Sequence, residues 1–172
     1  MDEKQFSDEL YLLLEKHFPK YIVTQGKSLL YKINIDTNGK LKPVNIENPS
    51  RGQFAFQTDL LISNKKVPLV VLELKFGGFS THDVLTYSTK AIKHKDIYPY
   101  LRYGFVVGGQ KMIDKKFFTH NVGFDFAYTF EKGDSSEKLF KLIKQQIKTS
   151  EHLISILAGK RISKYTTYIE IR

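Results

Sequence analysis

Hydrophobic side chains recur at helical spacing near the start of this 172-residue chain. Over residues 3–17, side chains recur at the spacing of a helix with about 3.6 residues per turn, namely Phe6, Leu10, Leu13, Leu14 and His17. Pro19 follows this stretch, and proline cannot continue a helix because it has no N–H to donate. The pattern therefore predicts a first helix over 3–17 that ends before Pro19.

The pattern changes to strand spacing in the segments that follow. Residues 20–35 alternate loosely and predict one or two strands, whereas residues 36–53 carry glycines and prolines and predict a long loop or an irregular hairpin. Residues 54–62 alternate between apolar and polar side chains, and residues 68–76 (PLVVLELKF) form a nearly continuous apolar run. These last two segments predict a hairpin whose second strand is buried in a sheet.

Helical and strand patterns alternate over the second half of the chain. In order, they predict a helix over 80–95, a strand over 101–107, a strand over 117–130, a helix over 135–158 and a final strand in the tail YTTYIEI. Because no Pro/Gly/Ser-rich linker divides the chain, we expect one domain over residues 1–172. The order of elements predicts an α/β or α+β fold in which helices pack on a central sheet.

The chain carries 27 Lys and Arg against 18 Asp and Glu, a net charge of +9. Such a surplus favours an anionic partner, with nucleic acid as the first candidate and an anionic membrane surface as the second, although solubility alone is an alternative explanation. The absence of cysteine excludes disulfides and thiolate metal sites. The N-terminus is unlike a signal peptide and no apolar run approaches the ~20 residues of a membrane span, so we expect a soluble, cytoplasmic protein.

Two charged residues interrupt the apolar run of residues 68–76. Glu73 and Lys75 are two positions apart, so in a strand they share one face, while Leu72 and Leu74 point the other way. An unpaired carboxylate or ammonium group in the protein interior costs several kcal/mol. These two charges therefore need compensating partners.

Asp59 is the candidate partner on the preceding strand. If the predicted hairpin turns about Lys66, Asp59 lies opposite Glu73, with a Cα separation of ~4.5–5.5 Å. Two carboxylates this close repel each other unless a cation neutralises them. Mg²⁺ held by Asp59 and Glu73 would meet this need, with Mn²⁺ as a substitute.

A metal ion at this position has a chemical use, since it could bind a phosphate oxygen and lower the pKa of a bound water. Lys75 on the same face could orient that water and stabilise the charge that builds on the phosphorus centre. The competing interpretation is a structural ion pair of Lys75 with Asp59 or Glu73 at a sheet edge. The E-x-K triplet alone does not separate the two.

The segment T-D-L-L-I, the thirteen residues between Asp59 and Glu73, and the segment V-L-E-L-K resemble the signature of the PD-(D/E)XK nuclease superfamily. The resemblance matches Asp59 to the first acid, Glu73 to the second and Lys75 to the lysine, with Thr58 in place of the proline. It implies a restriction endonuclease-like core of helix, three strands, helix and strand (αβββαβ). Residues 3–107 follow this order, and the C-terminal helix and strand are additions to it.

The resemblance also suggests residues around this core. Many members of the superfamily carry a Glu on the first helix, and Glu9 is the candidate here, although it could equally be an ordinary surface acid. Asp83 and Tyr87 resemble a Q-x-x-x-Y element in which Asp replaces Gln. Helix capping by Asp83 and core packing by Tyr87 are equally consistent with the sequence.

Basic residues near the expected site are candidate DNA contacts. Lys90, Lys93 and Lys95 lie on the helix after the E-x-K strand, and Arg51 lies in the loop before Asp59. These side chains could bind phosphates. Favourable charge at a helix C-terminus explains the three lysines equally well.

The resemblance implies a Mg²⁺-dependent DNA endonuclease, first of restriction type on duplex DNA. The alternatives are a structure-specific resolvase of DNA junctions and a catalytically silent DNA-binding module of the same fold. Because cutting both strands usually takes two active sites, a homodimer is one expected assembly. A methyltransferase or helicase partner is left open by the sequence.

Overall fold

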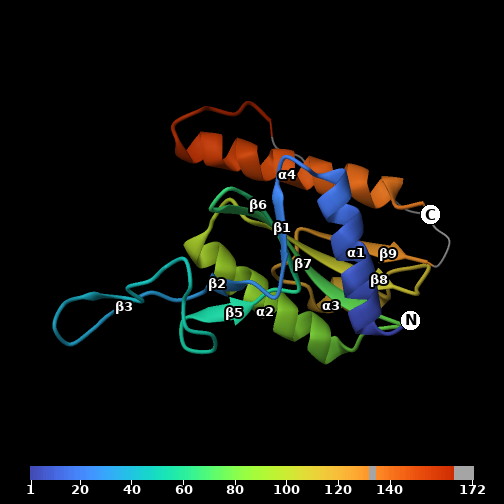
Figure 1. Ribbon diagram of the computed structural model, residues 1–172, viewed down its shortest axis with the longest axis horizontal. Coiled ribbons are helices and arrows are strands. Elements are labelled where there is room, and N and C mark those ends of the chain that lie inside the picture. The colour runs from blue at the N-terminus through green and yellow to red at the C-terminus, as the bar shows by residue number, and fades with distance from the viewer. Residues whose placement is uncertain (132–134, 165–172) are drawn as a thin grey trace.

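A five-stranded mixed sheet forms the centre of the protein, and helices cover both of its faces (Figure 1). The structure is a computed structural model, which describes residues 1–131 and 135–164. In spatial order, the strands are β1 (Ile22–Gln25), β6 (Leu60–Asn64), β7 (Val67–Phe76), β8 (Arg102–Gly108) and β9 (Phe126–Phe130). β1, β6 and β7 pair antiparallel, whereas β7, β8 and β9 pair parallel. The predicted central sheet flanked by helices is confirmed.

Different helices cover the two faces of the sheet. The helices are α1 (Glu3–His17), α2 (Thr81–Ile97), α3 (Lys115–His120) and α4 (Glu137–Leu157). α1 and α4 pack on one face, in a buried apolar cluster that includes Leu72 and Leu74. α2 and α3 pack on the other face, in a cluster that includes Val71 and Phe105. Because successive side chains of a strand alternate between its faces, Glu73 lies on the α2 face.

The β6–β7 hairpin follows the predicted register at its open end. Leu60 pairs with Leu72, and extending this ladder by one residue places Asp59 opposite Glu73. Towards the turn, the register shifts by one residue between Ile62 and Ser63. The shift lies far from the charged positions, so it does not disturb their relative placement.

The predicted strand over 54–62 is interrupted at Thr58. β5 (Ala55–Gln57) leaves the main sheet and pairs with β2 (Ser28–Leu30) in a separate two-stranded sheet. The Thr58 N–H and hydroxyl both donate to the carbonyl of Lys27, at 3.0 Å each. These bonds replace the ladder bonds that a continuous strand would make, so the chain changes sheets just before Asp59.

The predicted strand over 117–130 is wrong in its first half. Residues 115–120 form α3, whose start is capped by the Asp114 side chain accepting a hydrogen bond from the Lys116 N–H at 2.9 Å. The aromatic alternation there reflects one buried side chain, Phe117, beside the exposed Phe118. The final strand predicted in the tail at 165–171 lies outside the described residues.

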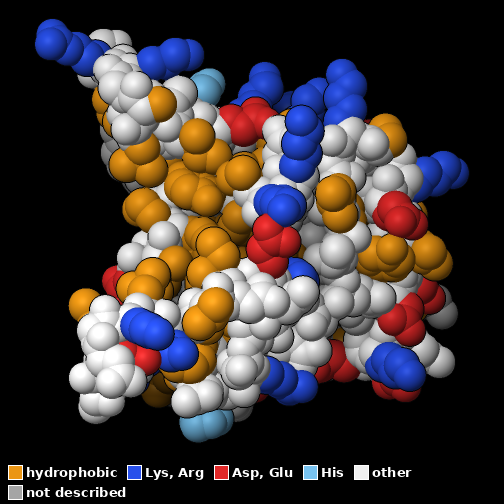
Figure 2. Space-filling view, turned by 60° about the vertical axis from the view of Figure 1, so that its left-hand side comes forward, with side chains coloured by type: hydrophobic (Ala, Val, Ile, Leu, Met, Phe, Trp, Pro, Cys, Tyr) orange, Lys and Arg blue, Asp and Glu red, His pale blue; other side chains and the backbone are white. Residues whose placement is uncertain are grey.

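A two-stranded arm extends from the end of the molecule where β2 and β5 lie (Figure 1). β3 (Asn34–Ile35) and β4 (Leu41–Lys42) pair antiparallel within it, so the irregular hairpin expected over 36–53 is present in part. Figure 2, which brings this side of the molecule forward, shows hydrophobic side chains gathered on its face. The exposed large apolar side chains of the arm are Ile33, Ile35, Leu41, Val44 and Ile46. Among the described residues, no helix is long and apolar enough to cross a membrane.

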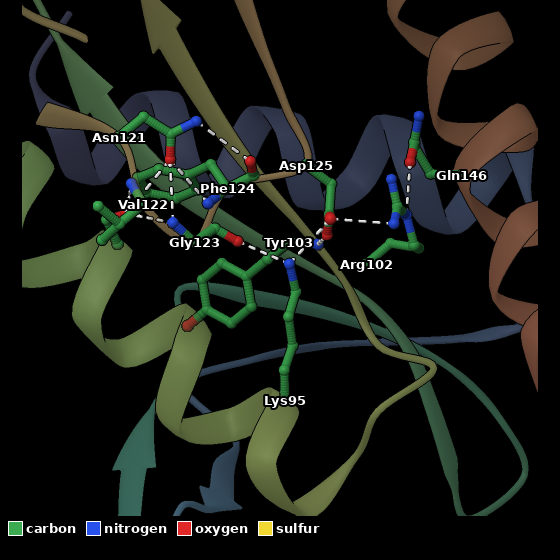
Figure 3. A network of polar contacts seen from close by, with 10 residues as sticks. Lys95, Arg102, Tyr103, Asn121, Val122, Gly123, Phe124, Asp125 and Gln146 are labelled. Atoms are coloured by element: carbon green, nitrogen blue, oxygen red, sulfur yellow. Dashed lines mark hydrogen bonds and ion pairs between the residues drawn. The ribbon is translucent and has the colours of Figure 1, made fainter. Parts of the chain in front are cut away.

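A network around Asp125 ties α2 to the start of β8 and to the segment before β9 (Figure 3). One Asp125 oxygen lies 2.8 Å from Lys95 Nζ and 2.9 Å from an Arg102 nitrogen, and the other accepts the Tyr103 N–H at 2.6 Å. Lys95 also donates to the carbonyl of Gly123 at 2.6 Å. Burial lowers the pKa of Lys95, and Asp125 offsets part of that effect. The network therefore depends on the charge of Asp125.

Replacing Asp125 with Asn should lower the free energy of unfolding by about 2–4 kcal/mol, because two partly buried cations would lose their shared anion. Chemical denaturation at pH 7 measures the change. Asp96→Asn is the matched control, since Asp96 is an exposed residue of α2, and it should change stability by less than about 0.5 kcal/mol. Equal effects of the two substitutions would contradict the structural role of the network.

Candidate functional site

Glu73 lies at the centre of the candidate site, on the middle strand of the sheet, and its side chain is fully buried. Two groups hold one of its oxygens, Oε1. Lys90 Nζ lies 2.7 Å away, and the hydroxyl of Tyr103 donates to the same atom at 2.7 Å. These two groups supply the compensation that the sequence pattern demanded for a buried carboxylate.

The other oxygen of Glu73, Oε2, is buried without a hydrogen-bond partner among the described residues. Burial raises the pKa of the Glu73 carboxyl to about 7, with Asp59 adding to this effect and Lys90 and Tyr103 opposing it. A buried carboxylate oxygen without a donor is costly and therefore uncommon in folded proteins. Oε2 is therefore an atom of the site that could bind a cation.

Lys75 extends the site towards the C-terminal end of β7. Its ammonium lies 3.3 Å from a carboxylate oxygen of Glu3 on α1 and 3.6 Å from one of Asp83 on α2. Burial opposes the charged form of Lys75, but Tyr87, Glu3 and Asp83 outweigh it and raise the pKa above its usual value. Lys75 is therefore a cation fixed in place by two acids from different helices.

One face of α2 supplies most of the remaining side chains. Asp83, Tyr87, Lys90 and His94 are spaced by four, three and four residues, which puts them on one side of a helix. The ammonium groups of Lys75 and Lys90 lie 5.5 Å and 5.1 Å from the centroid of the Tyr87 ring, within range of a cation–π interaction. Tyr87 thus contacts both lysines of the site.

Asp83 caps α2, one of the roles expected from the sequence, and also pairs with Lys75. It completes a capping box with Ser80, because its carboxylate accepts the Ser80 N–H at 2.7 Å and the Ser80 hydroxyl accepts the Asp83 N–H at 3.1 Å. The carboxylate also pairs with Lys75. Capping therefore fixes the start of α2 relative to the lysine of β7.

Asp59 is joined to the site through the backbone of β7. One of its oxygens accepts the Leu74 N–H at 2.7 Å, and its own carbonyl accepts the Gly26 N–H at 3.2 Å. Burial raises the pKa values of Glu73, Tyr87 and Tyr103, and the charge of Asp59 adds to this effect. The sequence-predicted set of Asp59, Glu73 and Lys75 therefore gathers on the α2 face at one region of the sheet.

A buried histidine continues the polar network behind Glu73. His94 Nδ1 lies 3.2 Å from the Tyr103 hydroxyl, and its Nε2 lies 3.1 Å from the carbonyl oxygen of Leu29. Burial lowers the pKa of His94 to about 4, and the nearby Lys90 adds to the shift. The imidazole of His94 is fully buried, and both of its ring nitrogens face oxygen atoms.

The other predicted site residues lie in different surroundings. Glu9 is exposed on α1, and the acid of that helix that reaches Lys75 is Glu3.

The four residues predicted to contact DNA lie in two kinds of surroundings. The ammonium group of Lys90 is paired with Glu73, and that of Lys95 is paired with Asp125. Lys93 and Arg51 are exposed. Only a three-dimensional arrangement separates these cases, because the lysines of α2 look alike in the sequence.

Several side chains of the site were missed from the sequence, namely Glu3, Tyr103 and the pairing role of Lys90. Two signals could have indicated Lys90 and Tyr103. Lys90 and His94 repeat at helical spacing with Asp83 and Tyr87, as a polar stripe on a helix with an apolar side. Tyr103 lies near the start of a buried strand, where its hydroxyl needs a partner.

The donor set suits a hard divalent cation. Glu73 Oε2 is buried and unpaired, and Asp59 supplies a second carboxylate close by. Among the described residues, no group of three or more His, Asp or Glu side chains is gathered to hold a metal. Mg²⁺ is commonly bound through one or two carboxylates with water completing its shell, so two carboxylates fit this ion.

The sequence matches no known protein family and no curated protein. The assignment of the site therefore depends on its own geometry.

The buried position of His94 makes a prediction about acid stability. The unfolded chain takes up a proton on this histidine near pH 6.5, whereas the folded protein does so only near pH 4. Stability should therefore fall as the pH drops through this window, by up to roughly 3 kcal/mol from this one group. Denaturation at pH 7 and pH 4.5 measures the free energy of unfolding, which should fall less between these two pH values in His94→Gln than in the wild type.

His152→Gln is the control for this experiment, because His152 is exposed on α4. It should lose as much stability on acidification as the wild-type protein. Lys90 and Tyr103 face His94 and are unchanged in both variants, so the comparison isolates the imidazole. An identical acid loss in His94→Gln and the wild type would refute a neutral buried His94.

Proposed function

We propose that this protein is a Mg²⁺-dependent DNA endonuclease with a restriction endonuclease-like core of the PD-(D/E)XK type. The observation that carries the proposal is the fully buried Glu73, which has one unpaired oxygen. It shares a face of β7 with Lys75 and lies opposite Asp59, which comes just before the neighbouring strand β6. A structural ion pair between Glu73 and Lys75 would have satisfied both charges. Instead each has separate partners, which is consistent with two distinct roles.

The arrangement of elements supports the same proposal. α1, β1, β6, β7, α2 and β8 follow the order of the αβββαβ core, and the β2–β5 sheet and the arm are an insertion between β1 and β6. The parallel crossover from β7 through α2 to β8 brings α2 over the face that carries Glu73. The polar face of α2 is thereby placed against the charged positions of β7.

The residues divide the chemistry between them. Asp59 and Glu73 would hold the metal ion, which when bound supplies a Lewis acid for a phosphate oxygen and a water of lowered pKa. Tyr103 orients Glu73 by its hydrogen bond to Oε1. Lys75, held by Glu3 and Asp83, supplies a fixed positive charge that stabilises the negative charge growing on the phosphate.

The substrate class follows from charge. The net charge of +9 favours a polyanion, and the exposed Lys93 and Arg51 are candidate phosphate contacts. We propose duplex DNA as the first substrate, with cleavage of restriction type. Junction cleavage without linear cleavage would instead favour a resolvase, and binding without cleavage would favour a silent module.

Purified protein should cut DNA in Mg²⁺ or Mn²⁺ and stop when a chelator removes the metal. Asp59→Asn and Lys75→Met should each lower the cleavage rate by roughly 10²–10³-fold or more, because they remove a metal ligand and the fixed cation. A panel of linear duplex, methylated duplex and four-way junction substrates measures the rate. Mapping the ends of the products then identifies the cutting position.

Lys144→Met is the matched control, since Lys144 is exposed on α4 and far in sequence from the site. It should cut at the wild-type rate. Circular dichroism must show that Asp59→Asn and Lys75→Met remain folded. Full activity in chelator would reject the metal mechanism, and wild-type rates in the two site variants would reject the assignment of the residues.

A further inference from the structure

Lys90 is the least expected member of the site. Its side chain starts on α2 and is 15% exposed, and its ammonium lies 2.7 Å from Glu73 Oε1 and 2.8 Å from the carbonyl oxygen of Gln57. The Tyr87 ring centroid is 5.1 Å away. These contacts place a full positive charge beside the carboxylate that the proposed function assigns to the metal.

The two lysines of the site are not equivalent. Lys75 is engaged by Glu3 and Asp83, two acids that are not part of the proposed metal-ligand set. Lys90 is engaged by Glu73, which belongs to the proposed metal-ligand set. A divalent cation bound by Glu73 would therefore lie within a few ångströms of the Lys90 ammonium, where like charges repel strongly because little water screens them.

We propose that Lys90 is the built-in counter-cation of Glu73 and competes with the divalent metal for it, so that Lys90 sets the metal affinity of the site. This inference rests on the metal site of the proposed function. In the metal-free protein the ammonium holds the buried carboxylate. Metal binding requires Lys90 to release Glu73, and the cost of that release weakens the binding.

The proposal separates Lys90 from a merely structural lysine. A structural ion pair predicts that removing Lys90 damages the fold and, with it, metal binding. A competing cation predicts the opposite change in affinity, since its removal leaves a buried carboxylate that binds a metal ion more tightly. Metal affinity measured without DNA thus distinguishes the two roles independently of cleavage.

The test is isothermal titration of the full chain with Mn²⁺ alone, comparing the wild type, Lys90→Met and Lys144→Met. Methionine keeps much of the apolar stem of lysine and removes its charge. Lys90→Met should bind Mn²⁺ at least about tenfold more tightly than the wild type, whereas Lys144→Met should bind as the wild type does. The melting temperature of Lys90→Met should be lower without metal and should rise more on adding Mn²⁺.

Unchanged or weaker Mn²⁺ binding by folded Lys90→Met would overturn the proposal. Lys90→Gln, which keeps a donor for the Gln57 carbonyl, applies the same test if the methionine variant does not fold. Titration of Glu73→Gln separates this inference from the proposed function. If the wild type binds Mn²⁺ and Glu73→Gln does not, but the Lys90 variants bind as the wild type does, only this inference is wrong. If neither the wild type nor the Lys90 variants bind Mn²⁺, the proposed metal site is wrong as well.

Discussion

The fully buried carboxyl group of Glu73 in the middle of the sheet is the constraint on which the site depends. β7 is apolar on both faces except at Glu73 and Lys75, so the α2 face must supply polar partners there. The partners of Glu73 come from α2 and β8, because the parallel β7–β8 pair requires a crossover and α2 is that crossover. The burial of Glu73 therefore depends on the crossover topology, because the crossover places the polar side chains of α2 against this carboxyl group.

The sequence reveals this constraint only in part. Glu73 and Lys75 stand out because charge interrupts an apolar strand, and Asp59 follows from the hairpin register, which a short turn fixes. The partner of Glu73 could not be found in this way. Lys90 on a helix looks like any solvent-facing lysine, and repulsion between Asp59 and Glu73 seemed to demand a metal as the cation. The structure shows that a lysine already meets part of that demand.

The polar network behind Glu73 restricts where protons can be. Tyr103 has one hydroxyl proton but lies between Glu73 Oε1 and His94 Nδ1, and the other nitrogen of His94 faces the Leu29 carbonyl. With a neutral His94 and an ionised Glu73, one of these contacts has no hydrogen. Because the pKa of Glu73 is raised to about 7 and that of His94 is lowered to about 4, a proton added to this network goes to the carboxyl before the imidazole. Protonation of Glu73 and the hydrogen position on His94 are thus coupled.

If the site binds a metal as proposed, its charges explain how a basic protein could hold a cation there. The site holds four acids and two lysines, Glu3, Asp59, Glu73 and Asp83 against Lys75 and Lys90, so the fully ionised set holds two more acids than lysines. A divalent cation would neutralise that excess, whereas a phosphate would add to it. The positive surface and the negative site therefore favour different ions, and a metal bound first would convert the site from one that repels a phosphodiester to one that accepts it.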